Sequence, residues 1–410
     1  MPALKILFLT QTYPRFDGDT AGPFIRDLAR GLAAGGDQVT ILTPHAEGVE
    51  DRWVEEDVEA ISFRYAPKSF EVLGYSRSLN KDEAIRWRAG AVAPLYSLAA
   101  RRAVKALARE REFDLVQGHW VVPNGLIVNA AGIETPTAVG LHGSDVFLAE
   151  RRGVRSLVRR ALQKTRLVTG CSPELVDRVC SLGFDRSRAH VIPYGVNGEQ
   201  FHPSPERRGI WRQRLGIPEA APVGLGVGRM VTKKGFHVLL DVLPEILESF
   251  PEVHFVLAGE GDRLAEFESR AAGGSERVHF PGVILRDTLP DLYRAADFFV
   301  LPAVHDAQGN VDGLPNVILE AMASGLPVVA SGISGIPLAI TDTREGFLVR
   351  EGDASELAAA LARVIDNKDS RRVMGQAARK KVEAELNWRA VAGRYHRAYE
   401  EAIADTSKSS

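Results

Sequence analysis

The sequence predicts an α/β protein built from two doubly wound parallel sheets, each in its own domain. Short β-branched runs alternate with longer helical patterns, as they do in the βαβ units of a parallel sheet. The alternation stops in a Pro- and Gly-rich stretch at 194–210 and then starts again. A chain of 410 residues, 45% hydrophobic and 25% charged, is also long enough to fill two cores.

The first half opens with KILFLT (5–10), which we expect to form the first strand. A helix is predicted for GPFIRDLARGLAAGG (22–36), because two glycines close its apolar pattern. The remaining predicted strands of this half are QVTILTP, DLVQGH, PTAVGLH, RLVTGCS and AHVIPYG. Residues 1–195 are therefore assigned to an N-terminal Rossmann-like domain.

The second half repeats this organisation. Its predicted strands are VGLGVGRM, VHFVLAGEG, RVHFPGV, DFFVLPA, LPVVAS and GFLVR, which places a C-terminal Rossmann-like domain at 196–385. Residues 386–410 are predicted as a helix with no strand after it, bracing either domain, and a return to the N-terminal domain is one option. In such a fold we expect the ligand in a central cleft, where strand ends of the two domains face each other.

Composition excludes several classes of protein. No stretch reaches the roughly 18 uninterrupted apolar residues of a spanning helix, and the short apolar start is typical of a strand and not of a signal peptide. Cys171 and Cys180 have no metal-site spacing, so we expect a cytoplasmic protein without a thiol metal site. A net charge of −2, with no aromatic residues among the basic ones, argues against nucleic-acid binding.

One basic segment leaves two interpretations open. RRGVRSLVRRALQKTR (151–166) contains seven basic residues and no acid, with Arg155 and Arg159 at helical spacing beside an apolar side. It is either a solvated helix with an ordinary core face or a peripheral contact with an anionic membrane, at its inner face.

Phosphate-binding signals point to two loops. The chain has neither G-x-G-x-x-G nor G-x-x-x-x-G-K-[ST], so dehydrogenase and P-loop interpretations lose their main support. In GRMVTKKGFHVLL, Arg229 and Lys234 bracket a short loop between a strand and a helix. A bidentate guanidinium and a mobile ammonium suit a diphosphate.

The stretch DGLPNVILEAMASGLPVVAS (312–331) complements that loop. A helix is predicted to begin at Asn316, so the N–H groups of Asn316 and Val317 form an anion site. Glu320, one turn further in, can accept hydrogen bonds from ribose hydroxyls, and Asp312 can do the same for a hexose. The spacing fits one molecule with a diphosphate in the middle and a sugar at each end.

Together these motifs resemble the retaining glycosyltransferases of family 4, which have the GT-B fold of two Rossmann-like domains. The resemblance covers nearly the whole chain and rests on YPRFDGDTAGPFIRDLARGLAAGGDQVTILTP, GRMVTKKG, and DGLPNVILEAMASGLPVVA followed by GISGIP. VQGHW, LHGSD and VIPYGVN support it. It implies that the N-terminal domain binds the acceptor and the C-terminal domain binds the nucleotide sugar.

The resemblance also implies individual roles. Arg229 and Lys234 would bind the donor diphosphate, Glu320 the ribose and Asp312 the donor sugar, while Gly22 would let the backbone approach the donor phosphate. The family usually has Glu where this chain has Asp312, which puts the identity of the donor in question.

Two histidines complete the predicted site. His119 in VQGHW and His142 in LHGSD follow predicted strands, and carboxyl ends of parallel strands are where such sheets bind ligands. The resemblance places both beside the donor sugar or the acceptor, as polar catalytic contacts with Asp312. Asp145 is a further candidate for orienting His142 or binding acceptor.

The function predicted from the sequence is retaining transfer of a sugar from a UDP- or GDP-sugar to a hydroxyl acceptor. The acceptor would be a sugar, a polysaccharide or a lipid-linked glycan, in surface glycan or glycolipid assembly. No metal cofactor is expected, because basic side chains and the helix N-terminus would stabilise the leaving diphosphate. The alternatives are a GT-B nucleotide-sugar epimerase or phosphorylase, or a two-domain sugar-binding protein.

Overall fold

The computed structural model describes residues 2–16, 19, 21–71, 73, 83–143, 146, 152–272 and 276–407. Contacts divide the chain into two compact units. One unit joins Met1–Ile192 to Trp388–Ser410, and the other is Pro193–Asn387; the sequence places these boundaries at 195 and 385. The candidate Asp145 lies outside the described residues.

The N-terminal unit contains an eight-stranded sheet in the order β3-β4-β2-β1-β5-β6-β7-β8. All pairs are parallel except β3 with β4. Its strands are β1 (Lys5–Leu9), β2 (Gln38–Pro44), β3 (Arg52–Glu55), β4 (Val58–Phe63), β5 (Leu115–His119), β6 (Thr137–Leu141), β7 (Leu167–Gly170) and β8 (Ala189–Val191). The order reverses direction between β1 and β5, which makes the ends of these strands the expected ligand position of this sheet.

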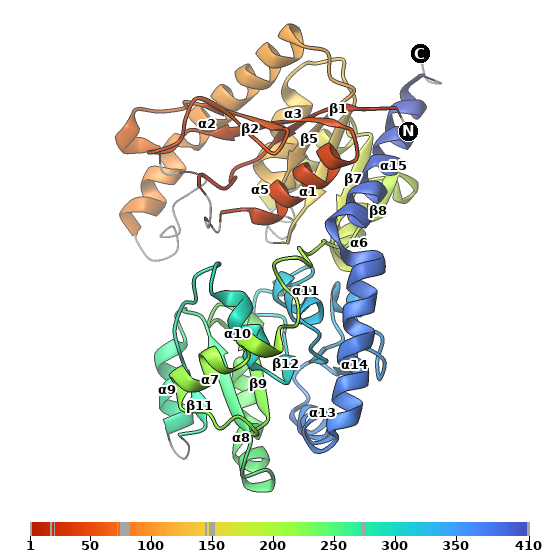
Figure 1. Ribbon diagram of the computed structural model, residues 1–410. Helices are drawn as coiled ribbons and strands as arrows, with labels where there is room; N and C mark the ends of the chain where they lie inside the picture. Colours follow the sequence, from red (N-terminus) through yellow and green to blue (C-terminus); the bar gives the residue numbers. More distant parts are fainter. Residues whose placement is uncertain are drawn as a thin grey trace. The chain divides into compact units, whose positions relative to one another are not determined.

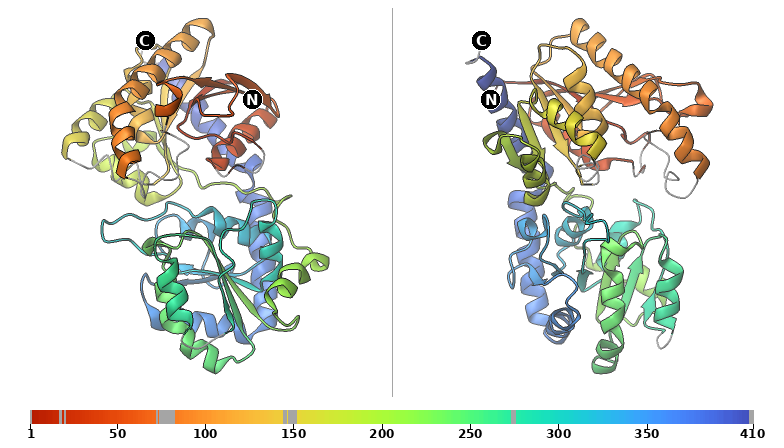
Figure 2. Two further views of the ribbon diagram at one scale, coloured as in Figure 1. Left: turned by 90° about the vertical axis from the view of Figure 1, so that its left-hand side faces the viewer. Right: turned by 180° about the vertical axis from the view of Figure 1, so that it is seen from behind.

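Helices cover both faces of this sheet (Figures 1 and 2), and alternate side chains of β1 pack into two different cores. Ile6 and Phe8 belong to a core with helices α1 (Pro23–Ala34) and α15 (Trp388–Ser407). Leu7 and Leu9 belong to a second core with α2 (Glu83–Glu110) and α3 (Leu126–Ala130). A strand buried on both faces is expected of a parallel sheet. The unit also contains α5 (Arg152–Leu162) and α6 (Pro173–Ser181).

Helix α15 is thus part of the N-terminal unit, although the chain reaches it from the C-terminal one. It packs along α1 so closely that a Cβ on Gly31 would lie 2.9 Å from the carbonyl oxygen of Trp388. His396 Nδ1 lies 2.9 Å from a carboxylate oxygen of the buried Asp37, which also accepts the Leu4 N–H at 2.9 Å. The helix is anchored by both apolar packing and a buried polar contact.

The hairpin β3–β4 is absent from the strands predicted by the sequence. Its two turn residues, Glu56 and Asp57, have φ of 46° and 64°. Both central residues of a type I′ hairpin turn need positive φ, and the usual signal is Asn-Gly or Asp-Gly. Glu-Asp gives no such signal, so this edge of the sheet could not be read from turn chemistry.

The C-terminal unit contains a six-stranded, fully parallel sheet in the order β11-β10-β9-β12-β13-β14. Its strands are β9 (Val223–Val227), β10 (His254–Ala258), β11 (Val278–His279), β12 (Phe298–Leu301), β13 (Val328–Ser331) and β14 (Gly346–Val349). Its helices are α7 (Gly209–Leu215), α8 (Phe236–Ser249), α9 (Leu264–Ala272), α10 (Leu289–Ala295), α11 (Asn316–Ala323), α12 (Ile336–Ala339), α13 (Ala354–Asp366) and α14 (Lys368–Lys381). Here the order reverses between β9 and β12, which again marks the ligand position. Two parallel sheets are what the sequence predicts.

No helix in the described part of the chain combines the length and apolar composition needed to cross a bilayer.

Candidate active site

The loops that follow β9 and β12 meet at the point where the C-terminal sheet reverses its strand order. Gly235, which closes the loop after β9, has φ of 72°, and a Cβ there would lie 1.6 Å from the carbonyl oxygen of Pro302. Only glycine combines this left-handed backbone with so close an approach. The glycine of the KKG motif therefore brings the basic loop onto the backbone that leads to Asp312.

An ion-pair cluster joins these two loops. The Nζ atoms of Lys233 and Lys234 lie 2.6 and 2.7 Å from the two carboxylate oxygens of Asp312. Burial opposes ionisation of this carboxyl, but the two ammonium groups outweigh burial and hold the pKa of Asp312 well below its usual range. The predicted diphosphate-binding Lys234 and sugar-binding Asp312 are in direct contact. Lys233 was not singled out from the sequence, although the double lysine was a visible signal.

Arg229 has a different environment, because its side chain is exposed. Among the residues that the structure describes, its guanidinium has no carboxylate partner within ion-pair distance. The N–H groups of such a guanidinium are available to a planar pair of phosphate oxygens.

Helix α11 begins at Asn316, as the sequence predicts. Pro315 precedes it without any side-chain cap, and the first N–H groups of a helix have no acceptor within the helix itself. The buried Oδ1 of Asn316 also lacks a hydrogen-bond partner among the described residues. Gly335 N donates to Gly313 O at 2.6 Å, which fastens the GISGIP segment to the loop before α11.

Glu320 lies one turn into α11, where its Oε2 accepts a hydrogen bond of 2.8 Å from the hydroxyl of Tyr293. Tyr293, on α10, is fully buried, and burial followed by the negative charge of Glu320 raises the pKa of its phenol well above the usual value. A phenol that stays protonated is a permanent donor and orients the carboxylate. Sequence reasoning missed Tyr293, which lies in no motif.

In the N-terminal unit, Gly22 stands at the start of α1 with φ of 65°. A Cβ at this position would lie 2.7 Å from Thr12 Oγ1 and 2.8 Å from Thr12 O. The loop after β1 therefore requires glycine there, which leaves bare backbone at the helix start, as the predicted approach of a phosphate demands.

The two predicted histidines are in contact at the ends of β5 and β6. His119 Nδ1 lies 3.0 Å from His142 Nε2. His142 is flanked by aromatic rings, with ring centroids 4.9 Å away in both Phe24 and Trp120. Burial lowers the pKa of His119 to about 3, and burial together with His119 lowers the pKa of His142 well below its usual value, so both rings are neutral at physiological pH.

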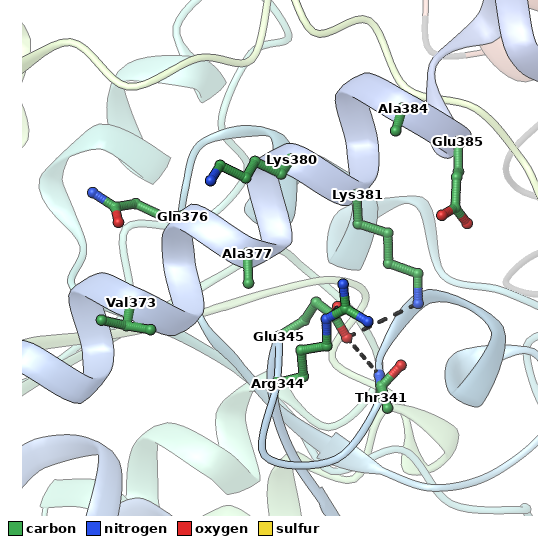
Figure 3. A pocket seen from close by; sticks show the side chains of 10 residues that line it. All are labelled: Thr341, Arg344, Glu345, Val373, Gln376, Ala377, Lys380, Lys381, Ala384 and Glu385. Atoms are coloured by element: carbon green, nitrogen blue, oxygen red, sulfur yellow. Dashed lines mark hydrogen bonds and ion pairs between the residues drawn. The ribbon is translucent and has the colours of Figure 1, made fainter.

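The C-terminal unit also has a pocket of about 650 Å³ that involves none of the predicted site residues. Figure 3 shows it between α14 and the turn before β14, where Arg344 and Lys381 approach the buried Glu345. Glu345 Oε2 also accepts the Thr341 N–H at 2.8 Å. Arg344 and Lys381 are thus already paired with a carboxylate of the same wall.

Two family models match the chain in succession. Residues 21–200 match Glycosyltransferase Family 4, and residues 221–367 match Glycosyl transferases group 1. The chain belongs to glycosyltransferase family 4. It is therefore an enzyme, a retaining glycosyltransferase that uses a nucleotide sugar, and the epimerase, phosphorylase and binding-protein alternatives are not favoured.

Several curated relatives of this glycosyltransferase are named as mannosyltransferases, and others as glycosyltransferases of teichuronic acid biosynthesis or of D-inositol 3-phosphate. A GDP-mannose-dependent monoacylated alpha-(1-6)-phosphatidylinositol monomannoside mannosyltransferase of Corynebacterium glutamicum is 29% identical over 81% of this chain and 88% of the relative. An MMP alpha-(1->4)-mannosyltransferase of Mycolicibacterium hassiacum is 28% identical over 93% of this chain and 95% of the relative.

Solved structures agree on the fold. Sucrose-phosphate synthase of Thermosynechococcus elongatus superposes with a TM-score of 0.77 at 22% identity, covering 98% of this chain and all of that chain. Anabaena Alr3699/HepE, solved in complex with UDP, gives a TM-score of 0.73 at 20% identity, covering 97% of this chain and all of that chain. The GT-B fold expected from the sequence is confirmed.

Proposed function

We propose that the C-terminal unit binds the donor at the point where its strand order reverses, with GDP-mannose as the nucleotide sugar. The observation that carries this proposal is the joining of Lys233, Lys234 and Asp312 beside the start of α11. One unit thus contains cations, the free N–H groups of a helix start and a carboxylate suited to sugar hydroxyls. The base and the sugar come from the relatives, since GDP-mannose-dependent enzymes stand among them.

In this proposal each group has one task. Arg229 and Lys234 bind the diphosphate, and the N–H groups of Asn316 and Val317 donate hydrogen bonds to a phosphate oxygen. Glu320, oriented by Tyr293, accepts hydrogen bonds from the ribose. As the glycosidic bond breaks, negative charge grows on the diphosphate, and the fixed positive charges stabilise it more than they stabilise the intact donor.

Asp312 changes partners in this sequence of events. Phosphate oxygens compete with its carboxylate for Lys233 and Lys234, so that donor binding releases Asp312 toward the hydroxyls of the sugar. The cations also replace the role that a divalent metal plays in other sugar transfers, and we propose that the reaction needs no metal ion.

Thermal stabilisation by nucleotides tests the donor site, because a ligand that binds the folded state raises the unfolding midpoint. We expect GDP and GDP-mannose to raise the midpoint of the unchanged protein more than UDP does, and Arg229→Ala and Glu320→Ala to abolish this. Arg344→Ala is the matched control, since it removes an exposed arginine of the same unit. A rise that survives in Arg229→Ala and Glu320→Ala would exclude this site, and a preference for UDP would exclude GDP-mannose.

We further propose that the acceptor is presented at an anionic membrane surface. Helices α2 and α5 both contact α3 on one face of the N-terminal sheet. Leu95, Leu98 and Leu157 are exposed on them, at 49%, 44% and 58%, beside exposed arginines such as Arg159 and Arg160. Exposed leucines among basic residues suit the headgroup region of an anionic bilayer.

Co-sedimentation with liposomes tests this surface. Vesicles containing phosphatidylglycerol should retain the protein better than phosphatidylcholine vesicles, and Arg159→Glu combined with Arg160→Glu should remove the difference. Arg372→Glu with Lys380→Glu, in the C-terminal unit, is a control of equal charge change. Equal retention on both kinds of vesicle would contradict the proposal.

A further inference from the structure

We propose that a chain of buried hydrogen bonds from Tyr399 in α15 fixes which nitrogen of His142 carries its proton. The inference rests on the proposed function, because His142 matters to the reaction only if the protein transfers a sugar and His142 contacts a substrate of that transfer, as the sequence predicts. It concerns Gln117, His119 and Tyr399 as positioning residues for that site.

The chain has three links. The Tyr399 hydroxyl donates to Gln117 Oε1 at 2.9 Å, Gln117 Nε2 lies 3.4 Å from His119 Nε2, and His119 Nδ1 lies 3.0 Å from His142 Nε2. Tyr399 and Gln117 are 0% exposed and His119 is 1% exposed. Water therefore does not compete for these polar atoms.

Which group donates and which accepts along these hydrogen bonds is set at the Tyr399 end. In the part of the chain that the structure describes, Gln117 is the one hydrogen-bond partner of this buried hydroxyl, and a buried phenol O–H needs an acceptor. The acceptor must be the amide oxygen, so the amide nitrogen of Gln117 faces His119. An amide nitrogen only donates, and His119 Nε2 must therefore accept.

The direction then passes through the two rings. A neutral imidazole has one N–H, so an accepting Nε2 places the proton of His119 on Nδ1. This Nδ1–H faces His142 Nε2, which must accept in turn. The remaining nitrogen of His142, Nδ1, then carries its proton.

The geometry of the rings agrees with such a bond. Their planes differ by 22° and their centroids are 5.2 Å apart, whereas the two nitrogens are only 3.0 Å apart. The rings consequently meet edge to edge and not face to face. The low pKa values of both histidines, which burial produces, keep each ring neutral, with one donor and one acceptor.

Gly140, on β6, leaves room for this chain of hydrogen bonds because it has no side chain. A Cβ on this residue would lie 3.1 Å from Gln117 Nε2, 3.2 Å from His119 Nδ1 and 3.3 Å from His142 Nε2. Three polar atoms of the chain converge over one residue that has no side chain. A methyl group there would separate the partners.

The consequence is that His142 carries an N–H at Nδ1, an atom that can then donate a hydrogen bond but cannot accept a proton. Residues of two different strands and of the last helix thus determine the chemical character of one ring in the site.

The test is nitrogen NMR of the unliganded protein labelled with ¹⁵N at histidine, which distinguishes a protonated from an unprotonated ring nitrogen. We expect His142 to be protonated at Nδ1 in the unchanged protein and in Tyr395→Phe. Tyr395, one turn earlier on α15, is also buried, but its hydroxyl neighbours Thr169, whereas Gln117 accepts the hydrogen bond of Tyr399. In Tyr399→Phe the Nδ1–H form should lose its dominance.

Gln117→Met removes the amide without emptying the site and is the second variant, in case Tyr399→Phe does not fold. A proton on Nε2 of His142 in the unchanged protein overturns the inference, as does an Nδ1–H form that persists in every variant that folds. Because no donor is present, this result does not depend on the identity of the nucleotide sugar.

Kinetics supply the link to function. Relative to Tyr395→Phe, Tyr399→Phe should lower kcat roughly tenfold, as outer hydrogen-bond partners of functional histidines do. A loss of stability alone would lower kcat equally in the two variants. Equal kcat values in the two variants would show that the proton position does not matter to the reaction.

Discussion

The candidate site residues of the two units lie at equivalent places in their sheets but differ in chemical character. In the C-terminal unit, Asp312 is ionised between Lys233 and Lys234. In the N-terminal unit, His119 and His142 are neutral and linked through buried hydrogen bonds. Charge that can exchange partners suits the binding and release of a diphosphate, whereas a fixed neutral chain suits the orientation of a sugar or an acceptor.

The largest expected effect comes from breaking the charged cluster. Lys234→Ala should lower kcat by about 100- to 1,000-fold, which is typical when one group that stabilises developing negative charge is removed. Steady-state kinetics with a nucleotide sugar measure it, and circular dichroism checks the fold.

Lys233→Ala is the matched control, because Lys233 contacts the same carboxylate but is less buried than Lys234. Its effect on kcat should be the smaller of the two. Equal losses in both variants would mean that the lysines act only as partners of Asp312.

The second prediction compares how the free energy of unfolding depends on pH through one group of each unit. The pKa of His119 is lowered to about 3 from 6.5, so the unfolded state binds this proton more tightly and acidification favours unfolding below pH 6.5. Relative to His119→Gln, the unchanged protein should lose about 2–3 kcal/mol of its free energy of unfolding between pH 6.5 and pH 4.5. Urea denaturation at several pH values measures this loss.

Asp312 has the same sign as His119, because its pKa is also lowered in the folded protein, but its pH window is lower. Its lowered pKa contributes stability above its unfolded value of 3.8, which is lost only as the pH falls below that value. Asp312→Asn should therefore leave the slope between pH 6.5 and pH 4.5 unchanged. A flat difference between the unchanged protein and His119→Gln over that range would show that His119 is not buried as a neutral ring.

The smallest effect is expected at the ribose end of the donor site. Tyr293→Phe removes the hydroxyl that orients Glu320 and should weaken binding of a nucleoside diphosphate by about 3- to 10-fold, near the net value of one hydrogen bond. Calorimetry with GDP and with its 2′-deoxy analogue measures it. If Glu320 binds the ribose, the preference for GDP over the analogue should shrink in this variant, and an unchanged preference would contradict that role.

Most of the fold could be predicted from the sequence because parallel strands carry local signals. Strands such as β1 and β12 are short apolar runs between helical patterns, and helix ends such as Gly35-Gly36 and Pro315 stop or start helices by backbone chemistry. The β3–β4 hairpin was missed because the Glu56-Asp57 turn lacks glycine.

The candidate site divides in the same way. Lys234, Asp312 and Glu320 could be located because they follow strands or open a helix within recognisable motifs. Tyr293 and Tyr399 could not, since each reaches its partner from a helix distant in sequence, and its spacing there is that of an ordinary core residue. Partners that only tertiary packing brings together leave no local pattern.

The position of α15 has a consequence for how the protein is made. On the ribosome, residues 1–192 emerge first and lack the helix that covers Ile25 and Leu28 of α1. The N-terminal unit cannot close that core until nearly two hundred further residues of the C-terminal unit have been synthesised. Nascent chains must therefore keep an apolar groove open during translation, and a fragment cut at the first boundary would be a substrate for chaperones and proteases, not a stable domain.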